Sequence, residues 1–275
     1  MGRVIIERSE ERSEMTASAS PAVPRDAATV VLLRDSPRGP EAYLLRRVTG
    51  MAFAGGMTVF PGGSVDATDA GIDTPWSGPS PAAWAERFAT SESLARALVC
   101  AAVRETFEES GVLLASRDAD EAVVDTGGTE WEAERAALEG RAQSLSELLS
   151  RRGLVLRADY LRAWSHWVTP EAEPRRFDTR FYVAGLPAGQ LTREVGGEAD
   201  RVHWTQPAAA VQAHRRGELP MMPPTVLTLE QISAYATVAE VLAAAEERTI
   251  TPIMPRLVSE GGAMRVVLPS EQGHQ

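Results

Sequence analysis

The sequence predicts a mixed fold of strands and helices, α/β or α+β. Three observations support this: a β-branched hairpin near the N-terminus, separated segments with helical periodicity, and strand-like runs that return between them. A chain of 275 residues with 44% hydrophobic residues can bury a sizeable core. We expect one folded domain over residues 25–260, after a disordered polar tail at 1–24 and before a C-terminal strand or tail at 261–275.

The first expected elements form a hairpin. Residues 27–33 (Ala-Ala-Thr-Val-Val-Leu-Leu) and 41–47 (Glu-Ala-Tyr-Leu-Leu-Arg-Arg) read as strands, because β-branched and apolar residues flank the turn-forming cluster at 35–40. A glycine-rich passage follows at 55–63. Residues 64–90 are rich in Asp, Gly, Pro and Ser and are expected to form loops.

The remaining elements alternate between helices and strands. Residues 90–110 predict a helix, with a capping Thr-Ser-Glu at its start and Gly111 at its end. Residues 130–150 have helical periodicity and lack proline. Further along, we expect strands at 176–184 and 200–204 and helices at 206–216 and 225–247.

Composition narrows the function classes. With 28 basic and 38 acidic residues the net charge is −10, which argues against binding to nucleic acid or to an anionic membrane. The single cysteine excludes an intramolecular disulfide and a multi-cysteine zinc site. We find no secretory signal and no apolar stretch of bilayer length, so we expect a cytoplasmic protein. A homodimer is left open.

Three glutamates on the helix at 90–110 are the strongest chemical feature. Glu105, Glu108 and Glu109 have the spacing i, i+3, i+4, which places them on one face, opposite Val103 and Phe107. Like charges at that spacing repel each other, and a divalent cation removes the repulsion. Mg²⁺ and Mn²⁺ prefer such oxygen donors. The residues alone leave two interpretations open, a metal site or a solvated acidic face.

The sequence around these glutamates resembles a known signature. Residues 104–112 (Arg-Glu-Thr-Phe-Glu-Glu-Ser-Gly-Val) are similar to the second half of the Nudix hydrolase signature, G-x5-E-x7-R-E-U-x-E-E-x-G-U, and Phe60-Pro61-Gly62-Gly63 to its beginning. The resemblance implies an α/β/α sandwich around a mixed β-sheet, here with extra C-terminal helices. It also implies hydrolysis of a nucleoside diphosphate linked to another moiety.

The spacing within the signature departs from the common pattern. The step from Gly63 to Arg104 is 104 − 63 = 41 residues instead of 14, an excess of 27, which we place in an insertion at about 64–90. Such an insertion resembles the acyl-coenzyme A diphosphatase branch. The first signature glutamate should lie eight residues before Arg104, where this chain has Arg96. We expect this change to weaken metal binding at most.

The resemblance assigns roles to individual residues. Glu105, Glu108 and Glu109 would bind Mg²⁺ or Mn²⁺, with the Gly62 carbonyl as a fourth ligand. Arg104 would orient a signature glutamate.

A carboxylate near the metal would accept a proton from the attacking water. Glu108 and Glu109 are candidates for this role. Glu198, in a loop before an expected strand, is another; it is equally well explained as a surface charge.

Substrate contacts are less specific. Gly63 suits a tight loop close to a phosphate. Arg46 and Arg47 could meet a 3′-phosphate or face solvent, and Trp167 could stack on an adenine or pack in the core.

Coenzyme A or an acyl-coenzyme A is the expected substrate, giving 3′,5′-ADP and (acyl-)phosphopantetheine. NADH or ADP-ribose is the alternative. Arg96 favours a second class, a catalytically inactive nucleotide sensor or binding module.

Overall fold

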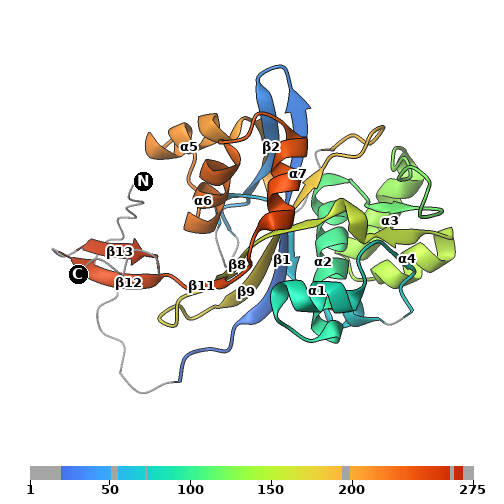
Figure 1. Cartoon of the computed structure of the whole chain (residues 1–275), viewed down its shortest axis with the longest axis horizontal. Coiled ribbons are helices and arrows are strands. Elements are labelled where there is room, and N and C mark those ends of the chain that lie inside the picture. The colour runs from blue at the N-terminus through green and yellow to red at the C-terminus, as the bar shows by residue number, and fades with distance from the viewer. Residues whose placement is uncertain (1–19, 51–54, 72, 194–198, 261–262, 269–275) are drawn as a thin grey trace.

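The structure is a computed structural model that describes residues 20–50, 55–71, 73–193, 199–260 and 263–268. Its mixed sheet lies between two layers of helices, with α1 to α4 on one face and α5 to α7 on the other (Figure 1). The predicted α/β sandwich is therefore confirmed. Most of the expected tail, residues 1–19, lies outside the described residues.

Eight strands form the main sheet. Its order is β10-β2-β1-β9-β8-β11, with β3 paired to β2 and β4 to β1. The pairs β1–β9 and β8–β11 are parallel, and the other pairs are antiparallel. The strands are β1 (Arg25–Ser36), β2 (Gly39–Arg47), β3 (Thr58–Val59), β4 (Gly62–Ser64), β8 (Arg162–Val168), β9 (Phe177–Gly185), β10 (Ala199–Thr205) and β11 (Pro252–Ile253).

Strand β1 is central and is covered on both faces. Val30 and Leu32 lie in the core cluster beneath α1 and α2, whereas Val31 and Leu33 lie in the cluster beneath α5 to α7. All four side chains are fully buried, which explains the continuous apolar run in the sequence. The expected hairpin with β2 is present, with Ser36 opposite Gly39.

Helix α2 (Glu92–Ser110) carries the three glutamates. The Ser91 side chain accepts a hydrogen bond from the Leu94 N–H (3.2 Å), and Gly111 ends the helix at a φ of +75°. Besides the apolar face with Phe107, most of the small and apolar side chains near the glutamates are also buried. From Ala97 to Ser110, the residues that are not buried are Glu105, Glu108 and Glu109, so this part of the helix is packed on several sides.

The extra segments form their own elements beside α2. The expected insertion holds η1 (Ala67–Ala70), β5 (Trp76–Ser77) and α1 (Pro81–Phe88). The expected helix at 130–150 is two helices. After α2 come β6 (Ala115–Ser116), α3 (Thr129–Glu139), α4 (Leu145–Arg152), β7 (Val155–Arg157) and η2 (Ala158–Tyr160), and β5, β7 and β6 form a small sheet.

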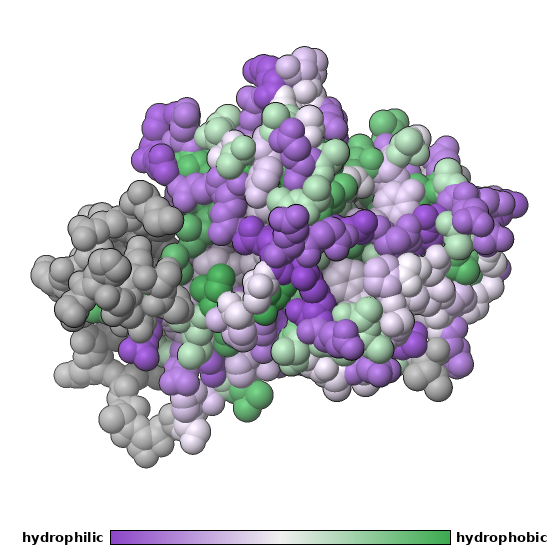
Figure 2. Space-filling model, viewed as in Figure 1, coloured by the Kyte–Doolittle hydropathy of each residue, from purple (hydrophilic) through white to green (hydrophobic). Residues whose placement is uncertain are grey.

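The C-terminal part differs from expectation in one respect. Residues 225–247 form two helices, α6 (Pro223–Ile232) and α7 (Val238–Glu247), because Thr237 caps a new helix by accepting from the Glu240 N–H. They follow α5 (Pro207–Arg215), and a hairpin of β12 (Arg256–Glu260) and β13 (Ala263–Val267) comes last. No helix within the described residues is long and apolar enough to cross a bilayer. On the face seen in Figure 2, apolar residues form small separate groups among hydrophilic ones.

Candidate active site

The site begins where β4 meets α2. Gly62 pairs with Thr29 and Gly63 with Ala28, so β4 lies along the start of β1. A Cβ on Gly62 would lie 2.5 Å from the Ala28 carbonyl oxygen, and a Cβ on Gly63 would lie 2.6 Å from Cδ of Glu105. Both positions therefore need glycine, and the second glycine allows the Glu105 carboxylate to lie directly against the strand.

A second glutamate is held by the same strand. The Gly62 N–H donates a hydrogen bond of 2.7 Å to Oε2 of Glu109. Glu105 and Glu109 are one helical turn apart, and both carboxylates lie against β4. The structure thus brings the glycine pair and the glutamate face together.

Arg104 links the helix to the loop that follows β4. Its guanidinium is buried, and it donates to Asp69 through Nε (3.0 Å) and Nη2 (2.9 Å). Nη1 donates to Oε1 of Glu105 at 2.7 Å and to Oε1 of Glu108 at 3.4 Å. Nη2 also donates to the Ser64 carbonyl at 2.9 Å. This geometry suits the orienting role that the signature implies.

Asp69 is a site residue that the sequence analysis missed. It is the sixth residue after Gly63, which is the signature position of the first glutamate when the count starts from the glycine. Counting back from Arg104 leads instead to Arg96, whose guanidinium lies over the Trp76 ring at 5.4 Å from its centroid. We infer that the extra residues begin after Asp69, not at residue 64.

The cluster is electrostatically strained. Burial and the neighbouring charge of Glu105 raise the pKa of Glu108 to about 7, although Arg104 opposes the shift. Burial alone would lower the pKa of Arg104, but its hydrogen bond to Asp69 and the charge of Glu105 raise it above the ordinary value. Arg104 therefore stays charged, and Glu108 titrates near neutral pH.

The donor atoms suit a hard divalent cation. Glu105, Glu108 and Glu109 supply carboxylate oxygens, the ligand type that Mg²⁺ and Mn²⁺ prefer. Within the described residues, however, no three His, Cys, Asp or Glu side chains are grouped as a metal site. The N–H groups of Arg104 and Gly62 occupy carboxylate oxygens of all three glutamates. A cation that binds through these same oxygens would have to replace their N–H partners.

The two candidate arginines of β2 have opposite orientations. Successive side chains of a strand point to opposite faces, and Tyr43 and Leu45 belong to the core beneath α2. Arg47 continues that series, so it lies on the face of the glutamates. Arg46 lies on the other face, with Leu44.

The other predicted contacts are placed elsewhere. Trp167 is buried in the cluster beneath α5 to α7, and its Nε1 donates to Ser165 Oγ at 3.1 Å. This is the face opposite α2, so the structure does not bring Trp167 to the glutamates. Glu198 lies outside the described residues.

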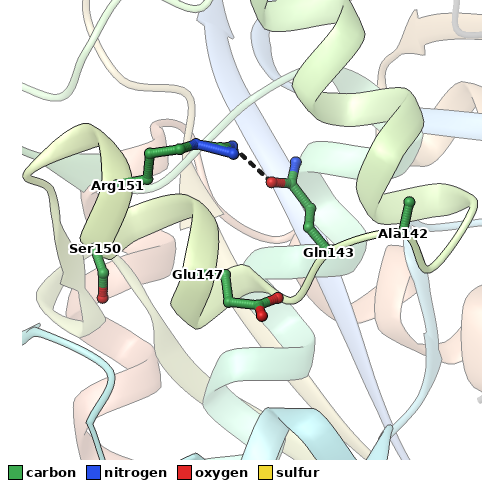
Figure 3. Close-up of a pocket in the computed structure, with 5 residues that line it drawn as sticks. All are labelled: Ala142, Gln143, Glu147, Ser150 and Arg151. Carbon is green, nitrogen blue, oxygen red and sulfur yellow. Dashed lines mark hydrogen bonds between the residues drawn. The ribbon is translucent and has the colours of Figure 1, made fainter.

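A surface cavity lies apart from the glutamates and Arg104, none of which lines it. A cavity of about 640 Å³ beside α4 is lined by Ala142, Gln143, Glu147, Ser150 and Arg151 (Figure 3). Arg151 Nη2 donates to Gln143 Oε1 at 2.6 Å, and Glu147 caps the start of α4. These contacts engage the Arg151, Gln143 and Glu147 side chains locally, and the acidic cluster remains the candidate site.

Comparison with known proteins identifies the family. The model of the NUDT19 Nudix domain matches residues 24–232. Putative nudix hydrolase 7 of Caenorhabditis elegans is 28% identical over 209 residues, covering 76% of this chain and 60% of that protein. Acyl-coenzyme A diphosphatase NUDT19 of Gallus gallus is 26% identical over 277 residues, covering 82% of this chain and 72% of the relative. The chain thus spans less than two thirds of the length of the C. elegans relative.

A solved structure is also similar to most of this chain. The NUDIX hydrolase from Alicyclobacillus acidocaldarius superposes with a TM-score of 0.67 at 31% identity, covering 80% of this chain and 96% of that one. The family model spans both halves of the signature, Gly62-Gly63 and the helix with Arg104 and the glutamates. The chain therefore belongs to the Nudix hydrolase family.

Proposed function

We propose that this chain is a metal-dependent diphosphatase that hydrolyses a phosphoanhydride bond in a nucleoside diphosphate linked to another moiety. The observation that carries the proposal is the convergence of Glu105, Glu108 and Glu109 with Arg104 and the Gly62-Gly63 strand. This arrangement combines hard oxygen donors for a metal ion with a glycine backbone that a phosphate can approach closely. Mg²⁺ or Mn²⁺, when bound, neutralises the charge of the diphosphate and lowers the pKa of a bound water.

The chain's own residues then have distinct tasks. Glu105 and Glu109 are held against β4 and act as metal ligands together with Glu108. Arg104 keeps the Glu105 carboxylate in place. Glu108 is our first candidate for accepting the proton of the attacking water, because its carboxylate belongs to the same cluster as Glu105 and Arg104. Glu109 and Glu198 remain alternatives.

Coenzyme A or an acyl-coenzyme A is our preferred substrate. Water attacks one phosphorus of the diphosphate, the bridging P–O bond breaks, and the products are 3′,5′-ADP and (acyl-)phosphopantetheine. Support comes from the match to the NUDT19 Nudix domain and from the Gallus gallus relative, which is named an acyl-coenzyme A diphosphatase. Arg47, on the glutamate face of the sheet, is our candidate for the 3′-phosphate.

An inactive nucleotide sensor now has less support. The feature that favoured it was Arg96 at the expected position of the first signature glutamate. Asp69 supplies a carboxylate from the glycine side of the signature, and it is paired with Arg104. The signature position of the first glutamate therefore carries a carboxylate, in the form of an aspartate.

A hydrolysis panel tests the proposal. Coenzyme A, several acyl-coenzyme A species, NADH and ADP-ribose are incubated with Mg²⁺ or Mn²⁺, and products are identified by chromatography with mass detection. Glu108→Gln is the matched control, because it removes one charge at nearly constant size. Formation of 3′,5′-ADP that is lost in the variant supports the proposal. Cleavage of NADH or ADP-ribose alone contradicts the coenzyme A preference, and binding without cleavage supports the sensor.

A further inference from the structure

Arg141 has an unusual backbone conformation at the end of α3. Its φ is +56°, in the left-handed region, and its N–H donates to the Leu138 carbonyl at 2.8 Å. Glycine is preferred at such a helix-ending position, because a Cβ there crowds the following carbonyl. The neighbouring helices α2 and α4 follow that preference with Gly111 and Gly153. Helix α3 has its glycine one position too early, at Gly140.

The Arg141 side chain extends to the loop after β4. Its Nη2 lies 3.2 Å from Oδ1 of Asp66, with exposed side-chain fractions of 77% and 25%. Exposed ion pairs contribute little to stability, less than a left-handed residue costs. Within the described residues one other non-glycine residue has a positive φ, Ala89 at the end of α1. Its methyl side chain cannot form an ion pair or a hydrogen bond. Stability therefore does not account for an arginine at this position, and strain of this kind is typical of functional regions.

Asp66 is the outer end of a continuous series of contacts into the site. Its N–H donates to Oδ2 of Asp69 at 2.8 Å, and the Asp69 N–H donates to the Asp66 carbonyl at 3.0 Å. Oδ2 of Asp69 also accepts from Arg104 Nη2 at 2.9 Å, and Arg104 Nη1 lies 2.7 Å from Oε1 of Glu105. Arg141 is thus connected to Glu105 through Asp66, Asp69 and Arg104.

We propose that Arg141 is a positioning residue for the active site. It fastens the loop at 64–70 to the end of α3, so that Asp69 keeps the orientation in which it holds Arg104 against Glu105. Arg141 acts through Asp66 and not on the substrate. The assignment rests on the proposed function, because the positioned group is a proposed metal ligand.

The test separates positioning from folding. Arg141→Gly removes the ion pair and also the left-handed strain, so its Tm should equal or exceed that of the wild type. Amide hydrogen exchange in residues 64–70 should accelerate by about two- to fivefold, because the loop loses an exposed ion pair. With coenzyme A and Mg²⁺, kcat should fall about tenfold with little change in KM, as expected for a misplaced group.

Two further variants complete the design. Arg141→Lys keeps a cation at the same backbone position. Compared with Arg141→Gly, it should retain more of the wild-type kcat and more of the protection from exchange. Arg216→Ala removes a comparable exposed pair, with Glu218 at the end of α5, and should leave both readouts unchanged.

Unchanged exchange and kcat in Arg141→Gly would overturn the proposal. A higher KM with unchanged kcat would do the same, because it would make Arg141 a substrate contact, and a lower Tm would make it an ordinary structural residue. If the wild-type chain hydrolyses nothing in the panel, the proposed function fails, and hydrogen exchange alone decides whether Arg141 anchors the loop.

Discussion

Arg104 and Asp69, 35 residues apart in the sequence, form a two-pronged ion pair with nitrogen–oxygen distances of 3.0 and 2.9 Å. The side chains are 7% and 1% exposed, so the pair is almost completely desolvated. It joins the loop after β4 to the middle of α2. Because Arg104 also contacts Glu105, the pair determines where that glutamate lies.

Asp69→Asn should destabilise the fold and impair the site together. Removing one partner of a buried ion pair typically costs about 3–5 kcal/mol when the other charge is left uncompensated. Arg104 keeps its contacts with Glu105 and Glu108 in this variant, so we expect a smaller loss in urea unfolding, together with a large fall in kcat/KM because Arg104 no longer holds a fixed position. Asp73→Asn, at an exposed position in the same segment, is the control and should behave as wild type. Full stability in Asp69→Asn would show that the pair contributes little.

The glutamate face of the site could be predicted from the sequence, whereas the pairing of Asp69 with Arg104 could not. The spacing of Glu105, Glu108 and Glu109 places them together on any helix, because helical periodicity alone decides it. The contact between Asp69 and Arg104 depends on how the extra residues fold between them. Counting back along the helix from Arg104 therefore led to Arg96, which lies against Trp76.

The boundaries of the helices also could not be predicted fully from the sequence pattern. Periodicity predicted one helix at 225–247, but the Thr237 side chain caps a second helix and divides the segment. For Arg46 and Arg47 the strand was predicted, yet which arginine faces the glutamates follows from the sheet register and from the helices that cover each face. Local pattern thus predicts elements, and the packing of distant segments decides which side chains meet.

Gly63→Ala should disrupt the site more than the fold. A methyl group on Gly63 would overlap the Glu105 carboxylate, which must then move away from β4. We expect Mn²⁺ affinity, measured by calorimetry, to fall about tenfold or more and kcat/KM to fall by a similar or larger factor, as for other displaced ligand and catalytic groups. Gly50→Ala is the matched control, because a Cβ there meets no atom of the described residues within 4 Å. Equal metal affinity in both variants would contradict the assignment of Glu105 as a ligand.

The raised pKa of Glu108 predicts a pH dependence of stability in the presence of a chelator. Burial raises this pKa from the ordinary 4.5 to about 7, so between these values the folded chain holds a proton that the unfolded chain has released. The Glu108 contribution to stability is therefore present below about pH 4.5 and is lost as pH rises through about 7. In urea unfolding at several pH values, Glu108→Gln should remove this component. The same slope in variant and wild type would assign it to other groups.

Arg135→Gln should loosen the end of α2 on which Glu108 and Glu109 lie. Arg135 is 5% exposed, and its Nη1 donates to the Glu108 carbonyl at 2.9 Å. That carbonyl belongs to the last turn of α2, where carbonyl groups lack partners within the helix. When this carbonyl loses its charged donor, the free energy of unfolding should fall by about 1–3 kcal/mol. Amide exchange near Gly111 should accelerate.

Arg152→Gln provides the comparison for Arg135. Arg152 pairs with Glu134 in the same helical layer, but its side chain is 31% exposed, so the change should cost no more than about 1 kcal/mol. A difference between the two variants in urea unfolding would show that the contact with the helix end is what matters. If both cost the same and exchange near Gly111 is unaffected, Arg135 serves only the ion pairs within α3, and the glutamates are held in place by β4 and Arg104.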